Sequence, residues 1–215
     1  MGMWLPDAKQ VELFRRNFDS ARGSLHVALS NPDHSVRMRA AYVIGEIGAS
    51  AKPAGQDLLA RLKDEPDELV RIYIVQALSA IDYDTNPALS MLADRYAALD
   101  GENVPPKVDH SYAEVDEKIT VASALYVLLK ADAKAKREYF DFVTKWLDPP
   151  ADDLSRNLLE GYWERRLVTV LALERMPDAV DAIPKLESLQ AEPNSKPWIG
   201  AHVPRVLAVL RKNVR

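Results

Sequence analysis

The sequence predicts an all-α fold, a right-handed α-solenoid (superhelix) of about five helical pairs. Apolar residues recur at three- and four-residue spacings along most of the chain, and no convincing two-residue alternation of a strand appears. A block of sequence also recurs at an offset of 34 residues, and a fixed period of this size is typical of helical arrays.

The repeat becomes visible when residues 32–62 are laid over residues 66–96. Nine of the 31 aligned positions are identical, which unrelated helices do not reach. The stretch PDHSVRMRAAYVIGEIG, from Pro32 to Gly48, is therefore one unit of something that recurs. The identical pairs are Pro32/Pro66, Asp33/Asp67, Val36/Val70, Arg37/Arg71, Ile47/Ile81, Pro53/Pro87, Ala54/Ala88, Leu58/Leu92 and Arg61/Arg95.

Each unit reads as two helices. Asp33 stands where it caps the first helix and Gly48 where it ends it. Pro53 suits the first turn of the second helix. The side chains expected in the core are Val36, Ala40, Val43, Ile44 and Ile47 in the first helix, and Leu58, Leu59 and Leu62 in the second.

The rest of the chain follows the same plan less regularly. Lys118 and Arg166 stand where Arg37 stands in the clear repeat, and Pro204 either kinks the closing helix or marks its start. The helices expected outside the clear repeat are 7–18, 116–129, 164–176, 182–189 and 198–210.

We expect one domain over residues 1–215. Gly, a double Pro and few apolar residues predict an inserted loop over residues 99–118, which is either functional or a hinge without a partner. The other parts are N-terminal capping helices (7–30), clear repeats (32–98), and degenerate repeats with a C-terminal cap (119–215).

The composition is that of a globular protein, 47% apolar and 28% charged, with a net charge of −4. No overall positive field attracts nucleic acid, and no apolar run is long enough to span a bilayer. The absence of Cys rules out disulfides and thiolate metal sites, and the four His lack metal-ligand spacing. We therefore expect no metal, no cofactor and no catalytic residue. We also expect a cytoplasmic location, although the absence of Cys fits either a reducing or an oxidising compartment.

The motifs NPDHSVRMRAAYVIGEIG and EPDELVRIYIVQALSAID resemble the HEAT and HEAT-like (armadillo-related) repeat family. The resemblance implies that the Val-Arg helix lines the concave side of a curved stack. It also implies that the Arg binds an acidic residue in the turn before it. That residue would be Glu65 for Arg71, but only Asn31 stands there for Arg37. Because the Arg recurs at an equal position, we favour a packing role for it over the binding of an anionic partner.

The resemblance predicts a ridge on the concave face, opposite the apolar stripes. Its residues mix aromatic and polar character, which suits a protein or peptide partner better than a phosphate backbone. The candidate partner-binding residues are Arg39 and Tyr42 in the first repeat, and Tyr73 and Gln76 in the second.

A second candidate lies in the stretch EGYWERR, residues 160–166. Tyr162, Trp163 and Arg165 combine flat aromatic area with guanidinium, a mixture common at binding hot spots. The alternative is a buried Trp at a helix start, with arginines exposed beside it.

Three functions stay open at this stage. The first is a non-catalytic scaffold that binds a protein or peptide partner on its concave face. The second is a HEAT-like DNA-binding enzyme of the alkylpurine DNA glycosylase type, for which Asp116, Trp163, Trp198 and the basic tail would be the pieces. The third is an accessory repeat domain of a larger enzyme, because the resembling repeats occur in bilin lyases and as accessory domains at the ends of larger enzymes. The start at Met1–Gly2–Met3 is compatible with a piece of a longer chain.

Overall fold

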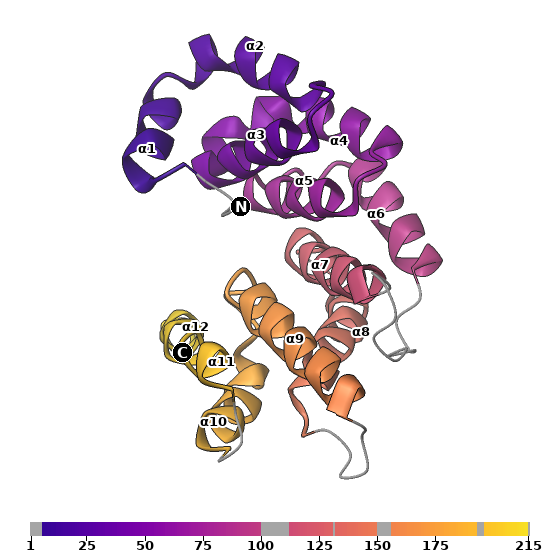
Figure 1. Cartoon of the computed structure of the whole chain (residues 1–215), viewed down its shortest axis with the longest axis vertical. Coiled ribbons are helices and arrows are strands. Elements are labelled where there is room, and N and C mark those ends of the chain that lie inside the picture. The colour runs from indigo at the N-terminus through magenta and orange to yellow at the C-terminus, as the bar shows by residue number, and fades with distance from the viewer. Residues whose placement is uncertain (1–5, 100–111, 131, 150–155, 193–195, 215) are drawn as a thin grey trace. The chain divides into compact units, whose positions relative to one another are not determined.

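The structure is a computed structural model, and it describes residues 6–99, 112–130, 132–149, 156–192 and 196–214. These residues form α-helices and short 3₁₀ turns, and none of them lies in a strand. The chain divides into two compact units, unit 1 (Met1–Leu92) and unit 2 (Ala93–Arg215). Helices follow one another in pairs in each unit (Figure 1), so the all-α fold of paired helices predicted from the sequence is confirmed for the described residues.

Unit 1 stacks its helices in two layers. One layer holds α1 (Ala8–Arg16), α3 (His34–Ile47) and α5 (Glu68–Ala80), with α3 packed between the other two. The other layer holds α2 (Phe18–Leu29) and α4 (Gly55–Asp64), and the 3₁₀ turn η1 (Gly48–Ala54) joins α3 to α4. The first half of α6 (Asn86–Ala98) ends unit 1, because the boundary falls inside this helix.

The caps predicted for α3 form, but Pro53 lies in η1 and not in the first turn of α4, because the chain makes a 3₁₀ turn before α4 begins at Gly55. The Asp33 carboxylate accepts a hydrogen bond from the Ser35 backbone N–H, and Asp67 does the same for the Val70 N–H at the start of α5. Gly48 ends α3 with φ +75°, a conformation that side chains with a Cβ rarely adopt. The innermost residues are Ile44, Leu58, Ile74, Leu78 and Leu92.

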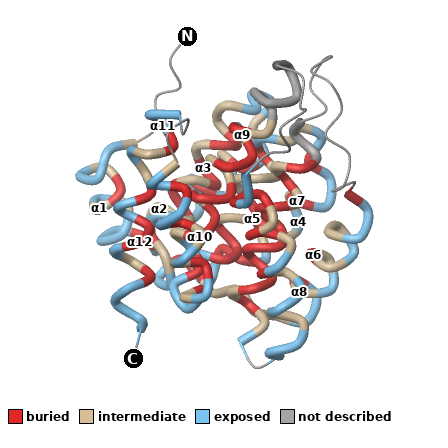
Figure 2. Tube along the Cα trace, turned by 90° about the horizontal axis from the view of Figure 1, so that it is seen from below, coloured by how far each residue is buried: buried red, intermediate tan, exposed pale blue. Residues whose placement is uncertain are grey.

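Unit 2 repeats the arrangement. Helices α7 (Tyr112–Leu128), α9 (Arg156–Leu173) and α12 (Val203–Arg211) contact one another in sequence. Helices α8 (Ala133–Thr144) and α10 (Ile183–Ala191) pack beside them, joined through η2 (Lys145–Leu147) and η3 (Val180–Ala182). Buried and exposed positions alternate along the helices (Figure 2), as amphipathic helices require.

Two expectations change at helix boundaries. Helix α7 begins at Tyr112, so the predicted loop 99–118 is helical from residue 112 onward, and residues 100–111 lie outside the described part. Val115 and Ile119 explain the early start, because they are buried one turn apart on α7. Pro204 marks a helix start, since it stands in the first turn of α12, after the short α11 (Pro197–Gly200).

Candidate partner-binding site

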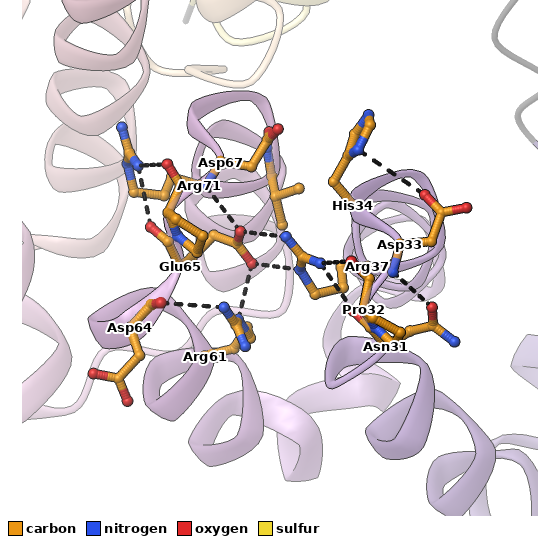
Figure 3. Close-up of polar contacts among 12 residues, drawn as sticks. Asn31, Pro32, Asp33, His34, Arg37, Arg61, Asp64, Glu65, Asp67 and Arg71 are labelled. Carbon is orange, nitrogen blue, oxygen red and sulfur yellow. Dashed lines mark hydrogen bonds and ion pairs between the residues drawn. The ribbon is translucent and has the colours of Figure 1, made fainter.

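Arg37 holds two repeats together and offers nothing to a partner. Its Nε and Nη2 donate to the two carboxylate oxygens of Glu65 at 2.8 and 2.7 Å (Figure 3), and both side chains are buried. Its Nη1 donates to the carbonyls of Asn31 and Pro32 at 2.8 and 2.9 Å. The packing role favoured from the sequence is therefore what Arg37 performs.

The carboxylate partner of Arg37 lies in the turn after it. The resemblance implied an acidic residue in the turn before each Arg, but Arg37 binds only backbone carbonyls there. Arg71 likewise donates to backbone carbonyls in the turn before it, those of Glu65 and Pro66. The carboxylate follows Arg37 in the sequence, and does not precede it, because stacking brings the turn of the next repeat against α3. Glu65 stands in that turn.

Glu65 is fully satisfied inside unit 1. Besides Arg37, it accepts hydrogen bonds from Arg61 Nε at 2.8 Å and from the Asp67 backbone N–H at 2.9 Å. Burial alone would raise the pKa of Glu65, but the hydrogen bonds from Arg37 and Asp67, with the charge of Arg61, hold it below its usual value. The hydrogen bonds to Glu65 raise the pKa of Arg37 in turn.

Unit 2 builds the same junction from different residues. Arg166 donates to the Glu192 carboxylate at 2.7 Å and to the Leu147 carbonyl at 2.8 Å. As at Arg37, the carboxylate comes after the arginine in the sequence and the carbonyl comes before it. Lys118 donates to the Leu99 carbonyl at 2.7 Å. Arg37, Lys118 and Arg166, which the sequence places at equivalent positions, thus all donate to a backbone carbonyl, and the two arginines also donate to a carboxylate.

The stretch 160–166 does not form an exposed hot spot. Trp163 is only 4% exposed and Arg165 is completely buried, which corrects the expectation that both face a partner. The physical reason is that α9 begins at Arg156, so Trp163 lies inside the helix, where the Arg166 guanidinium stacks over its ring at 4.7 Å. Tyr162 is partly exposed, and its hydroxyl donates to the Asp148 carbonyl.

The predicted ridge of unit 1 does bring its residues together. Tyr42 on α3 and Tyr73 on α5 meet edge to face, with ring centroids 6.1 Å apart and planes at 76°. Arg39 lies one turn before Tyr42 and Gln76 one turn after Tyr73, and all four side chains are partly exposed. Leu69, one turn before Tyr73 and 41% exposed, extends this row and was missed from the sequence.

The pieces of the glycosylase alternative lie in unit 2. Burial raises the pKa of Asp116 on α7 to about 6, against the attraction of Arg165, whose Nε lies 3.9 Å from the carboxylate. Trp198 is 41% exposed, whereas Trp163 is buried and cannot stack on a base without leaving the core. Among the described residues, no group of three His, Cys, Asp or Glu side chains is placed to hold a metal ion.

The comparison with protein families bears on the first part of the chain. The family model for HEAT repeats matches residues 11–100. This part of the chain is therefore similar to HEAT repeats. The match begins inside α1, runs through α6 and includes the ridge, and in unit 2 Arg166 also donates to a carboxylate later in the chain, as Arg37 does. No curated protein and no solved structure matches the chain. In the described part, no helix is both long and apolar enough to cross a membrane.

Proposed function

We propose that this chain is a non-catalytic HEAT-like scaffold that binds a protein or peptide partner through the ridge of α3 and α5. The ridge consists of Arg39, Tyr42, Tyr73 and Gln76. The contact between Tyr42 and Tyr73 carries the proposal, because it joins two neighbouring repeats into one partly exposed aromatic surface. Tyr and Arg are the residue types that dominate binding energy at protein interfaces.

The test is capture of partners from the source cells by the wild-type chain and by the double variant Y42A/Y73A. We expect the double variant to retain its helical circular dichroism and to capture the partner at least about tenfold more weakly. W198A is the matched control, because Trp198 is an exposed aromatic side chain of unit 2. Undiminished capture by the double variant would remove the ridge from the proposal, and loss with W198A would move the site to unit 2.

Duplex DNA provides the test of the glycosylase alternative. With a net charge of −4 and no basic ridge, we expect no DNA binding whose affinity falls steeply with salt. A titration at low salt that showed such binding would favour the enzyme. The cytoplasmic location and the role as an accessory domain of a larger enzyme stay predictions.

A further inference from the structure

An apolar groove of about 470 Å³ lies in unit 1, between α1, α2 and α3. It is separate from the contact of Tyr42 with Tyr73, but it shares one residue with the ridge, Arg39. The lining consists of Pro6 at the rim, Gln10, Leu13 and Phe14 from α1, Leu25 and Ala28 from α2, and Val36, Arg39, Ala40 and Val43 from α3.

The side chains of the groove follow helical periodicity. Those from α1 are spaced i, i+3 and i+4, and those from α3 are spaced i, i+3, i+4 and i+7. Each helix thus turns a stripe toward the groove, which is the pattern by which helices pack on one another. Leu13 is 64% exposed, and Phe14 and Val36 are only partly buried, so the described residues leave this apolar surface incompletely covered.

The walls of the groove are held in place. Val11 is buried and anchors α1, and Arg15 donates to the carbonyls of Glu46 and Ile47 at 2.6 and 3.2 Å. These bonds attach the end of α1 to the C-terminal carbonyls of α3, which lack partners within their own helix. A groove with fixed walls costs little ordering when a ligand enters it.

Arg39 supplies a specific polar contact at the groove wall. Its Nε is buried and has no hydrogen-bond partner among the described residues, and the lining contains no Asp or Glu. The nearby Asp33 already uses its carboxylate to cap the Ser35 N–H. A carboxylate brought by a ligand would satisfy the guanidinium with a charge-assisted hydrogen bond in largely apolar surroundings.

We propose that the groove receives an amphipathic helix of the protein partner, with apolar side chains in the groove and an Asp or Glu on Arg39. The proposal rests on the proposed function and specifies the partner's chemistry, because a segment bound at Arg39 reaches both the groove and the ridge. A second copy of the chain fits worse. A symmetric pair would place the same groove on itself, with Arg39 near its own copy and no carboxylate in either lining.

The experiment selects binders from a displayed library of amphipathic helices, using the full chain. The expected sequences carry an apolar stripe at i, i+3 or i+4 and i+7, with an acidic residue at its edge. One selected peptide, labelled, is then titrated against variants by fluorescence anisotropy. L13E should weaken binding at least about tenfold, because it places a charge in the apolar groove.

Two controls make the result specific. V27E introduces the same acidic side chain on α2, at a position that is 68% exposed and outside the groove lining. This variant should therefore bind the peptide like wild type. R39Q should weaken the peptide about tenfold, yet leave unchanged the affinity of the same peptide with Gln in place of its acidic residue.

Each contrary outcome overturns the proposal. Equal effects of L13E and V27E would show that the groove is not the site. A dimer in solution that L13E converts to monomer would assign the groove to a second copy, and binding of a labelled fatty acid but of no peptide would assign it to a lipid. Peptide binding that appears only after Trp4 and Leu5 are replaced by Ser would assign it to the chain's own N-terminal segment.

The failure of this inference is distinguishable from the failure of the proposed function. If Y42A/Y73A loses the cellular partner while L13E keeps it, the ridge is supported as the binding site and the groove is excluded. If L13E loses the partner while Y42A/Y73A keeps it, the groove is supported as the binding site and the two tyrosines are excluded from it.

Discussion

Glu65 shows how one residue serves several neighbours. Its side chain is completely buried and accepts hydrogen bonds from two arginines and one backbone N–H. A buried ion pair contributes little by itself, but removing one partner leaves the other charge buried and uncompensated. The carboxylate is therefore the residue of unit 1 whose loss we expect to cost most.

The substitution E65Q should lower the free energy of unfolding by about 3 kcal/mol, because Arg37 loses its counter-charge. Urea unfolding followed by circular dichroism measures it. E187Q is the control, since Glu187 pairs with Arg211 at the surface, with its side chain 49% exposed, and should cost less than about 1 kcal/mol. Similar losses in the two variants would contradict the role given to Glu65.

The same variant should change the acid stability. The pKa of Glu65 is lowered in the folded chain, so its stabilising contribution is complete above the unfolded value of about 4.3. That contribution is lost as the pH falls through the still lower folded pKa. Wild type should therefore lose its advantage over E65Q in this acidic window, and an advantage that stayed constant down to the most acidic point would count against the assignment.

Asp116 should have the opposite effect on pH dependence. Burial raises its pKa to about 6, so ionisation costs more in the folded chain than in the unfolded one, where the pKa is about 3.9. Stability should fall as the pH rises from about 4 to about 6 and then level off. We expect D116N to flatten this part of a stability profile measured by thermal unfolding, and an unchanged slope would exclude Asp116 as its source.

At the scale of elements, two helix glycines differ in their surroundings. A Cβ added at Gly23 on α2 would meet nothing within 4 Å, whereas one at Gly45 on α3 would lie 3.2 Å from the Ala77 Cα on α5. Gly45 therefore permits the close approach of α3 to α5, on which the neighbouring Tyr42–Tyr73 contact depends. Gly23 has no such role and merely weakens its helix.

We expect G23A to raise the free energy of unfolding by about 0.8 kcal/mol and the melting temperature by about 2 °C. G45A should lower both, since the gain in helix propensity is outweighed by the separation of α3 from α5. Calorimetry of the two variants measures the contrast. A stabilised G45A would show that α3 and α5 accommodate the added methyl group without separating.

The elements also show how far a sequence predicts structure. The offset of 34 residues aligned Arg39 with Tyr73 and Tyr42 with Gln76, which placed all four residues on one face of two neighbouring helices, where Tyr42 and Tyr73 meet. The burial of Trp163 and Arg165 was not predictable in this way, because an aromatic and basic composition suits a surface and a core stack equally well. The sequence did not predict that Leu13 is exposed in a groove, because its exposure depends on how α1 packs on α3. Arg15 fixes this packing by donating to the carbonyls at the end of α3.

At the scale of the whole molecule, contacts between elements join helices that are close in sequence, as in other helical arrays. Stability in such an array is a sum of local terms, so damage at one junction need not spread along the chain. The junctions at Arg37–Glu65 and Arg166–Glu192 each join an arginine to a later carboxylate and to an earlier backbone carbonyl, and they lie in different compact units. They form a matched pair of sites at which to disturb the array.

Hydrogen exchange followed by mass spectrometry should therefore respond locally. E65Q should speed exchange in α2 to α5 and leave α9 to α12 close to wild type, because unit 2 keeps its own junction. R166Q should do the reverse, since it removes the donor to Glu192 and to the Leu147 carbonyl. Equal acceleration along the whole chain in both variants would show that residues 1–215 unfold as one cooperative domain, as the sequence-based division assumes, and not as two units.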